Sequence, residues 1–397
     1  MAEAGKVHRA TTTAPVNIAV IKYWGKRDTN LNLPANSSLS VTLSQKSLRT
    51  LTTATCSESY TGPDSLILNG EEEEIQSSKR TQACLRNLRQ LREEVEAKDG
   101  SAPKLSKMPL RLVSANNFPT AAGLASSAAG FAALVRAIAN LYELPQTPQQ
   151  LSLIARQGSG SACRSLMGGY VAWRSGTKED GSDSLAEEVA PVAHWPEMRA
   201  LILVVSADKK GVPSTAGMQT TVATSSLAPA RFKDIVPARM AEIEKAIQDK
   251  DFETFARVTM QDSNSFHAIC LDSWPPIQYL TDVSRAAMNA VETINRKAGK
   301  LIAAYTFDAG PNAVIYYLEP DSRAVAGVFK NHLPRVEGWD NEFGAAIRSN
   351  EMGGLDSKAV MTLKNGISRV ICTAVGGGPE SVETHLVDES GKPVEGT

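Results

Sequence analysis

Apolar residues in the first third of the chain occur in short or alternating stretches, which is the pattern of β-strands. Residues 16–23 form an apolar run that holds one Asn and one Lys, and residues 41–55 repeat Leu, Thr and Val with near-alternation. Residues 66–68 lead into Asn69-Gly70, a strong hairpin sequence. The first third is therefore expected to consist of strands linked by tight turns.

The next segments predict helices around a short strand. Apolar residues recur every three or four positions across residues 77–98, which predicts an amphipathic helix that begins at Ser77. A short strand is expected at residues 110–113. Thr147 is then an N-cap residue followed by proline at the first helical position, and this pair predicts a helix through Arg156.

Glycine-rich breaks divide the segments that follow. A Gly-Ser-Gly-Ser sequence at residues 158–161 ends the preceding helix, and a second short helix is expected up to Met167. Two glycines then lead into a strand at residues 170–174. Residues 175–191 are rich in Gly, Ser, Asp and Glu, so we expect a surface loop or a domain boundary there.

The second half of the chain combines strands with more helices. Its pattern predicts strands at residues 201–205, 301–307, 313–318 and 368–374, and helices around residues 216–226, 232–249, 251–266, 275–298 and 321–332. Neither half alternates strand and helix strictly, so each half is predicted to be α+β. At roughly 100 to 200 residues per domain, the chain should form about two domains. We place them at residues 1–195 and 196–397.

The charge balance excludes several classes of partner. The 42 Lys and Arg residues against 43 Asp and Glu leave a formal net charge of -1, and no block is rich in basic residues. Sequence-independent binding of nucleic acid needs a concentrated basic face and is not expected. No apolar stretch approaches the roughly 20 residues that span a bilayer. Residues 1–13 lack the apolar core of a secretory signal, so we expect a cytoplasmic protein with no membrane partner.

The cysteines and histidines give no support for a disulfide framework or a zinc site. The five cysteines are scattered, odd in number and without a CxxC pair, so all five are expected to be reduced thiols. The five histidines never form an HExxH pattern.

Small residues at residues 118–130 indicate a site for an anion. Gly123, Ser126 and Ser127 stand where a helix should begin. The unpaired N–H groups of a helix start attract phosphate, and small residues let it approach closely. Close helix packing through these small residues explains the composition equally well. Walker A and GxGxxG sequences are both absent.

A second glycine-rich turn, at residues 158–161, also combines small residues with serine hydroxyls. Ser159 and Ser161 lie on a glycine-rich turn at a helix start, and Arg164 follows one turn later. An arginine binds carboxylate or phosphate through two parallel hydrogen bonds, so it would meet an anion held by the turn. A Ser/Gly turn by itself is usually only a loop.

Lys22 and Asp308 are charged residues whose neighbours in the sequence limit what they can do. Lys22 lies within an apolar strand, where an unpaired ammonium is costly, so it needs an anionic partner. The alternative is that Lys22, Lys26 and Arg27 extend their charged ends to solvent. Asp308 lies between two strands, just before Gly310, and is either part of an Asx-turn or a catalytic group.

Taken together, five segments resemble the mevalonate diphosphate decarboxylase family in its fungal and animal form: APVNIAVIKYWGKRD, NNFPTAAGLASSAAGFAAL, GSGSACRSLMGGYVAW, MQDSNSFHAICLDSWPPI and AYTFDAGPNAVIYYL. The resemblance runs in order from about residue 9 to about residue 380. The family belongs to the superfamily of galactokinase, homoserine kinase, mevalonate kinase and phosphomevalonate kinase, whose PxxxGLxSS loop is present at residues 119–127.

The resemblance implies both a fold and a reaction. The fold is that of the superfamily kinases, α+β with an active-site cleft between an N-terminal α/β domain, of the type shared with a small-subunit ribosomal protein, and a C-terminal ferredoxin-like α+β domain. The reaction uses ATP and Mg²⁺ to phosphorylate the tertiary 3-hydroxyl of (R)-5-diphosphomevalonate. Phosphate and CO2 then leave, and isopentenyl diphosphate is formed. The resemblance also suggests a homodimer.

The resemblance implies residue roles as well. Asp308 matches the catalytic carboxylate, Lys22 the lysine beside the transferring phosphoryl group, and Ser127 the serine that orients the γ-phosphate. Asn17 and Arg164 match the residues that hold the substrate carboxylate. The nucleotide loop contributes Ala121, Gly123, Leu124, Ser126 and Ser127. The diphosphomevalonate pocket is matched by Tyr23, Trp24, Gly25, Lys26, Arg80, Ser159, Gly160, Ser161, Ala162, Cys163, Arg164, Ser214 and Thr215. The magnesium ligands and the adenine pocket are not identified.

One feature favours decarboxylase over kinase. The kinases of the superfamily carry an acidic residue in the segment that corresponds to residues 157–173, and here that segment has no Asp or Glu. Two alternatives remain open at this point. One is a superfamily kinase that acts on mevalonate or a phosphate of it, and the other is an inactive metabolite-binding protein.

Overall fold

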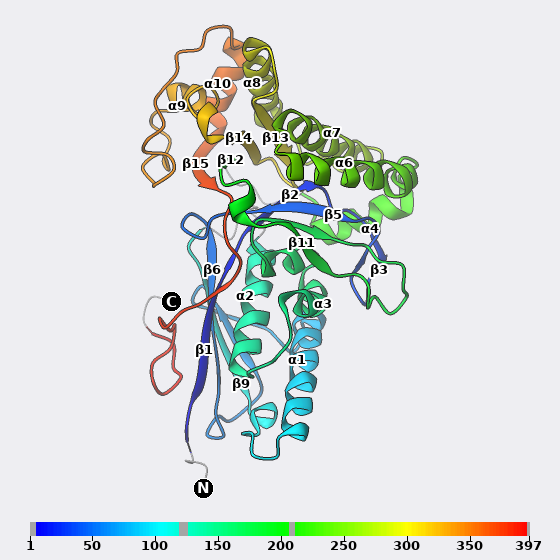
Figure 1. Ribbon diagram of the computed structural model, residues 1–397, viewed down its shortest axis with the longest axis vertical. Helices are drawn as coiled ribbons and strands as arrows, with labels where there is room; N and C mark the ends of the chain where they lie inside the picture. The colour runs from blue at the N-terminus through cyan, green and yellow to red at the C-terminus, as the bar shows by residue number, and fades with distance from the viewer. Residues whose placement is uncertain (1–4, 119–125, 206–210, 395–397) are drawn as a thin grey trace.

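The computed structural model describes residues 5–118, 126–205 and 211–394. These residues form an elongated molecule, with the first half of the chain at the bottom of Figure 1 and most of the second half at the top. Both halves combine sheets with helices, which confirms the predicted α+β class. Within the described ranges, no helix is long and apolar enough to cross a membrane.

The first half is built on a mixed sheet with helices on one face (Figure 1). The described strands lie in the order β16-β1-β6-β9-β7-β8, and α2 packs on β1 and β6. The last strand of the chain, β16, therefore pairs with the first. The strands are β1 (His8–Pro15), β6 (Arg49–Cys56), β7 (Ser65–Leu68), β8 (Glu71–Glu73), β9 (Leu110–Asn116) and β16 (Glu380–Ser381), and the helices are α1 (Lys79–Lys98), α2 (Ser126–Leu141) and α3 (Pro148–Gly158).

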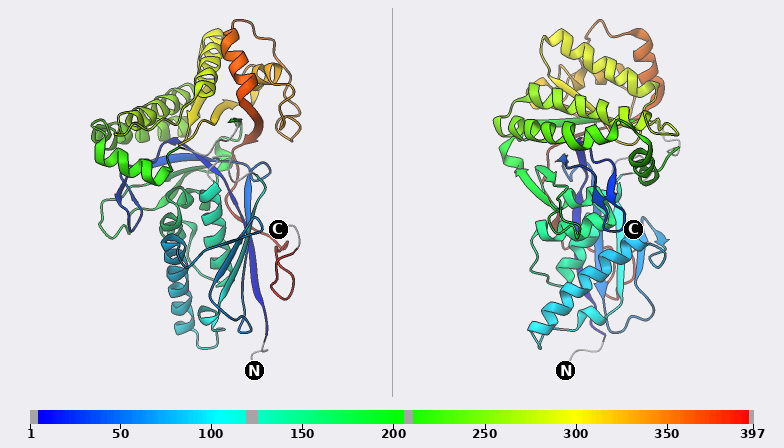
Figure 2. Two further views of the ribbon diagram at one scale, coloured as in Figure 1. Left: turned by 180° about the vertical axis from the view of Figure 1, so that it is seen from behind. Right: turned by 90° about the vertical axis from the view of Figure 1, so that its right-hand side faces the viewer.

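A second sheet lies across the middle of the molecule (Figure 2). Its described strands follow the order β11-β10-β5-β2, and a short ribbon of two strands extends from it. A 3-10 helix, Gly160–Leu166, connects α3 to β10. The strands are β2 (Asn17–Ile21), β5 (Ser38–Thr42), β10 (Tyr170–Trp173) and β11 (Ala186–Ala190), and the ribbon consists of β3 (Lys26–Asp28) and β4 (Leu33–Pro34).

The second half of the chain forms an antiparallel sheet with strand order β13-β14-β12-β15. Alternate residues of each strand face opposite sides, so Leu201 and Leu203 pack toward α8, α9 and α10, whereas Ala200 and Ile202 pack toward the second sheet and α7. The strands are β12 (Met198–Val205), β13 (Ala303–Phe307), β14 (Ala313–Leu318) and β15 (Ile367–Ala374). The helices are α4 (Ser214–Thr224), α5 (Ala228–Ala230), α6 (Val236–Asp249), α7 (Phe252–Leu271), α8 (Asp282–Ala298), α9 (Ala326–His332) and α10 (Ser357–Gly366).

Local sequence chemistry predicted two elements correctly. Asn69 and Gly70 join β7 to β8, and both have positive φ angles, 50° and 84°, as the tight hairpin turn requires. Thr147 caps α3 with a complete capping box, and proline occupies the first turn.

Other predicted boundaries are wrong for local reasons. Ser78, not Ser77, caps α1, because the Ser78 hydroxyl accepts the N–H of Thr81. The single alternating stretch predicted at residues 41–55 is divided between β5 and β6. The loop predicted at residues 175–191 contains β11, an edge strand that buries only its two alanine ends, while Glu188 at its centre is exposed.

Two helices of the second half also differ from prediction. The helix expected from residue 275 begins at Asp282, where Thr281 provides the cap. The intervening residues include two prolines, which cannot donate backbone hydrogen bonds, and they place Ile277 in a buried cluster instead. The helix expected at residues 251–266 continues to Leu271, and α10 was not predicted.

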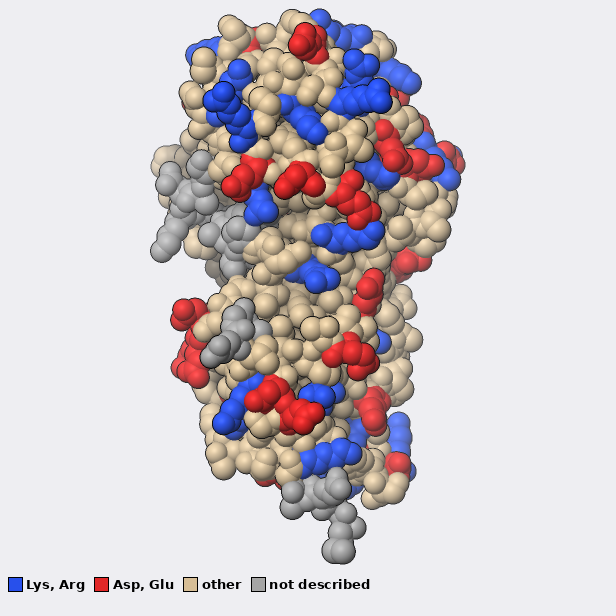
Figure 3. All heavy atoms as spheres, turned by 90° about the vertical axis from the view of Figure 1, so that its left-hand side faces the viewer, with Lys and Arg blue, Asp and Glu red and all other residues tan. Residues whose placement is uncertain are grey.

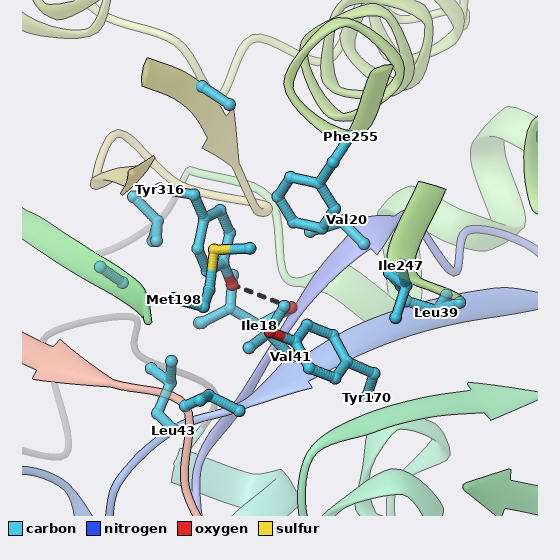
Figure 4. Close-up of a cluster of buried hydrophobic side chains, with 14 of the residues drawn as sticks. Ile18, Val20, Leu39, Val41, Leu43, Tyr170, Met198, Ile247, Phe255 and Tyr316 are labelled. Atoms are coloured by element: carbon cyan, nitrogen blue, oxygen red, sulfur yellow. Dashed lines mark hydrogen bonds between the residues drawn. The ribbon is translucent and has the colours of Figure 1, made fainter. Parts of the chain in front are cut away.

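The largest apolar core crosses the boundary between the halves (Figure 4). Ile18 of β2 and Val41 of β5 pack with Phe255 of α7 and Tyr316 of β14, and all four side chains are at most 2% exposed. The Tyr316 hydroxyl donates to the Ile18 carbonyl oxygen at 3.3 Å, the dashed contact in Figure 4. The two halves therefore share one desolvated interface and should unfold together.

We predict that Phe255→Ala lowers the free energy of unfolding by about 3–5 kcal/mol, because it opens a cavity in this shared core. The transition in urea should remain single and cooperative. Met361→Ala on α10 is the control, since Met361 is 58% exposed and its truncation should change stability by no more than about 0.5 kcal/mol. Two separate unfolding transitions in the parent protein would contradict a shared core.

Candidate functional site

Lys22 and Asp308 meet at the boundary between the two halves. The Lys22 Nζ atom lies 2.6 Å from Asp308 Oδ1 and donates a hydrogen bond to it. Lys22 directly follows β2, and Asp308 directly follows β13, where the Gly310 N–H donates to the Asp308 carbonyl oxygen at 2.7 Å. The two ends of these strands thus bring together charges that are far apart in the sequence.

Burial makes this contact necessary for Lys22. Its side chain is only 3% exposed, and burial lowers the pKa of the ammonium, while the adjacent Asp308 carboxylate raises it. The prediction that Lys22 needs an anionic partner is confirmed, and the alternative in which it extends to solvent is wrong. The Asp308 side chain is 36% exposed, so the carboxylate is accessible to a ligand while the ammonium lies behind it.

Arg164 is a second buried cation close to Lys22. Its side chain is 1% exposed, and burial lowers its pKa. Nε donates to Ser40 Oγ at 3.0 Å and to Asn17 Oδ1 at 3.3 Å, and Nη1 donates to Ser38 Oγ at 2.5 Å. These hydroxyl and amide oxygens orient the guanidinium but carry no negative charge. Arg164 therefore keeps a positive charge that a bound anion can compensate.

The predicted anion site at α2 is described only in part. The described part of α2 runs from Ser126, and the Ser127 hydroxyl is exposed, 3.3 Å from the hydroxyl of Ser159. Two hydroxyls therefore lie beside the positive end of a helix. Ala121, Gly123 and Leu124, together with the side chain of Ser126, lie outside the described residues.

An apolar cavity of about 200 Å³ opens beside Ser127, and sequence reasoning did not identify it. Its walls come from β7, β9, α1 and α2. The lining residues are Leu66, Leu68, Thr81, Ser114, Asn116, Ser127, Gly130, Phe131 and Leu134. Leu66 and Leu68 belong to the segment that was predicted to lead into the hairpin turn, but the cavity arises from packing between elements that lie apart in sequence.

Arg80 of the first half contacts Thr215 of the second half at another edge of the site, near Lys26. Arg80, in the first turn of α1, donates from Nη2 to Thr215 Oγ1 at 2.9 Å, next to Ser214 at the start of α4. Burial, and then the nearby charge of Arg80, lower the pKa of Lys26 to about 8. Arg27 does not join them, because its guanidinium donates to carbonyl oxygens of the loop after β10.

Tyr23 directly follows Lys22 and packs beside the glycine-rich turn that contains Gly160. Its ring packs edge-on against Trp173 at 4.8 Å, and a side chain at Gly160 would approach the Tyr23 ring within 2.7 Å, so glycine is required there. The Tyr23 hydroxyl is buried and has no hydrogen-bond partner among the residues that the structure describes. A ligand oxygen would satisfy it.

Some matched residues point their side chains into the core. Trp24 packs against Phe266 and donates its indole N–H to Thr221 at 3.0 Å. Ala162 and Cys163 are fully buried in two apolar clusters. At these positions only the backbone can contact a ligand. The same holds at Gly25, which has no side chain and a φ of 92°.

The site gathers positive charge that the whole surface does not display. Acidic and basic side chains are interspersed over the face in Figure 3, in keeping with the net charge of -1. Among the described residues, no group of three His, Cys, Asp or Glu side chains is arranged to hold a metal ion. Hydroxyls and cations that can donate to phosphate oxygens, with one accessible carboxylate beside them, are the groups expected in a site for phosphorylated ligands.

Comparisons with known proteins agree along the whole chain. Residues 14–186 match the family model of the diphosphomevalonate decarboxylase-like N-terminal domain, and residues 200–382 match that of the mevalonate 5-diphosphate decarboxylase C-terminal domain. A diphosphomevalonate decarboxylase of Aspergillus fumigatus is 70% identical over 391 residues, which is 97% of each chain.

Solved structures give the same result. A crystal structure of mevalonate 5-diphosphate decarboxylase is 54% identical, with a TM-score of 0.89, and the match covers 96% of this chain and 98% of that one. A structure described as MDDEF in complex with MVAPP, AMPPCP and magnesium is 31% identical, with a TM-score of 0.74, over 95% of this chain and 100% of that one.

We predict that Lys22→Met leaves the thermal unfolding midpoint unchanged or raises it. The change removes a desolvated ammonium and its repulsion from Arg164, and Asp308 stays partly solvated. Arg92→Met is the contrasting variant, because it leaves the buried carboxylate of Glu96 without its 3.0 Å partner and should cost about 3–5 kcal/mol. An equally large loss for Lys22→Met would show that Lys22 serves the fold.

Proposed function

The chain belongs to the mevalonate 5-diphosphate decarboxylase family, and from this premise we propose how its residues carry out the ATP-dependent decarboxylation of (R)-5-diphosphomevalonate. The enzyme is a carboxy-lyase that uses ATP and Mg²⁺. Its products are isopentenyl diphosphate, ADP, phosphate and CO2. The observation that carries the residue assignment is the contact between Lys22 and Asp308 across the two halves.

Asp308 is the proposed group that orients or deprotonates the 3-hydroxyl of the substrate. Its partial exposure makes the carboxylate reachable, and the buried ammonium of Lys22 fixes one of its oxygens. The same ammonium stabilises the negative charge that develops as the hydroxyl oxygen attacks the terminal phosphate of ATP.

Arg164 and Asn17 are proposed to hold the substrate carboxylate. A tertiary hydroxyl is a poor leaving group, and loss of CO2 requires an electron sink on the neighbouring carbon. Phosphorylation of the hydroxyl provides that sink. Arg164 suits the role because Ser38 and Ser40 orient its guanidinium without neutralising it.

The nucleotide is proposed to lie along the start of α2. The Ser127 hydroxyl, 3.3 Å from the Ser159 hydroxyl of the diphosphomevalonate pocket, would donate to its γ-phosphate, and the cavity between Leu68 and Phe131 would receive the base. Bound Mg²⁺ would neutralise phosphate charge, and it usually keeps few protein ligands beside those phosphates. The scarcity of clustered carboxylates among the described residues is compatible with this arrangement.

The diphosphate of the substrate is proposed to bind between Lys26, Arg80 and the start of α4. Ser214, Thr215 and the Tyr23 hydroxyl would add donors, as would the backbone of residues 159–163. Because Arg80 and Thr215 come from different halves, a diphosphate at this position would link the halves.

The proposal also includes a domain boundary, a cellular location and an oligomeric state. The domain boundary near residue 195 is supported by family models that end at residue 186 and resume at residue 200. A cytoplasmic location is supported by five unpaired cysteine thiols. A homodimer is supported by the family resemblance and by the exposed apolar side chains of Leu271 and Trp274, which are 58% and 76% exposed.

We predict equal amounts of ADP, CO2 and isopentenyl diphosphate from purified protein supplied with MgATP and diphosphomevalonate. Asp308→Asn should lower kcat by about 10²- to 10⁴-fold, because it removes the positioned carboxylate. Asp249→Asn, in a surface ion pair, is the matched control and should leave turnover unchanged. Formation of ADP without CO2 would indicate a kinase, and an Asp308→Asn variant within about tenfold of the parent would refute the role of Asp308.

The lowered pKa of Lys26 predicts a pH dependence of substrate binding. Between about pH 7 and about pH 9.5 Lys26 loses its proton, since its pKa is about 8, while the substrate diphosphate keeps its charge. The KM for diphosphomevalonate should therefore rise by roughly tenfold. Lys26→Arg, which stays charged, should flatten this rise in steady-state assays. The same rise in both proteins would rule out Lys26 as its cause.

A further inference from the structure

One face of α7 lies behind both members of the Lys22–Asp308 contact. It carries Asp262 and Ser263, both fully buried, and His267 one turn further on. These residues belong to a segment that resembles the family, residues 260–277, to which the proposed reaction assigns no role.

Asp262 holds the main chain of Lys22. Its Oδ2 atom accepts the Lys22 backbone N–H at 2.7 Å. Arg231 donates to both carboxylate oxygens, at 2.9 Å and 2.8 Å, and Arg239 adds a third contact at 3.1 Å. The Lys22 carbonyl oxygen in turn accepts hydrogen bonds from Asn36 at 2.9 Å and from Arg231 at 3.4 Å. Both backbone polar groups of Lys22 are thereby fixed.

Ser263, the next residue of α7, holds the chain on the other side of the contact. Its hydroxyl accepts the backbone N–H of Phe307 at 3.1 Å, and Phe307 directly precedes Asp308. The His267 ring also packs against the ring of Phe307, with the two centroids 6.3 Å apart. Side chains of α7 thus bind the backbone of Lys22 and the backbone of Phe307, the residue before Asp308.

A purely structural ion pair would not need this arrangement. Asp262 and Arg231 satisfy each other through two parallel hydrogen bonds, and Arg239 adds a second cation. Using the same carboxylate to bind the N–H of Lys22 fixes the distance from α7 to that residue. The Ser263 contact fixes the corresponding distance to the end of β13.

We propose that α7 sets the geometry of the Lys22–Asp308 contact: Asp262 positions Lys22 through its backbone N–H, and Ser263 positions Asp308 through that of Phe307. Both are positioning residues and neither touches the substrate. The inference rests on the proposed roles of Lys22 and Asp308. A displacement of about 1 Å at such a contact costs on the order of 10² in rate.

The principal test is Ser263→Ala, which removes one acceptor and leaves the ion pairs intact. We expect kcat to fall by on the order of 10-fold or more, with KM for ATP and for diphosphomevalonate within about threefold of the parent. Ser263→Thr restores the hydroxyl and should recover most of the rate. Thr259→Val is the matched control, because Thr259 is a fully buried residue one turn earlier on α7 whose hydroxyl has no partner within the described residues. It should leave kcat unchanged.

A double-variant cycle separates positioning from general stability. Once Asp308→Asn has removed the carboxylate, adding Ser263→Ala should cause little further loss, whereas a structural effect would multiply with it. Asp262→Asn should likewise add little to Lys22→Met. Full activity in Ser263→Ala, a change in KM alone, or multiplicative losses would overturn the inference. Retained activity in Asp308→Asn by itself would instead refute the proposed role of Asp308.

Discussion

A buried ammonium at the junction of the two halves determines what the surrounding structure must provide. Desolvation disfavours the charge of Lys22, and a carboxylate 2.6 Å away, contributed by the second half of the chain, compensates it. The compensation fails if the halves separate by even a few ångströms. The apolar core between the second sheet, α7 and β14 is thus a condition for the charge as well as for stability.

Two cations lie close together at this junction, and burying them among apolar groups alone would cost desolvation free energy. Lys22 and Arg164 are both buried, and the charge of Arg164 contributes to lowering the pKa of Lys22. The Asp308 carboxylate beside them is partly exposed to solvent. Such a site is better matched by a polyanion than by water. The overall charge of -1 gave no indication of this, because ligand choice depends on the local field and not on the sum of charges.

Sequence reasoning succeeded where short-range chemistry decides the structure. The Asn69-Gly70 turn and the Thr147 cap involve atoms only a few residues apart. It failed at β11, whose polar composition matches a loop and whose strand state depends on pairing with β10. The need of Lys22 for a carboxylate was visible from its apolar neighbours, but a family resemblance was required to select Asp308 from the other acidic residues.

The remaining partners of Arg164 and of the Lys22 backbone could not have been read from the sequence. Ser38, Ser40 and Asp262 are ordinary polar residues until the fold brings β5 and α7 to the site. The segment around Asp262 is one of the five that resemble the family. The resemblance does not say which atoms this segment contacts. Only the three-dimensional arrangement shows that its carboxylate binds a backbone N–H on another element.

The return of β16 to the first sheet also governs the order in which the molecule can be completed. β1 is paired on one side by β6 and on the other by β16, and Leu386 and Val387 pack against Val113 of β9. During synthesis the first half emerges with the outer edge of β1 unpaired and part of its sheet uncovered. That edge is closed only when residues 380–381 have also been synthesised, so the first half of a nascent chain presents an unpaired strand edge while the whole second sheet-and-helix half is still being made.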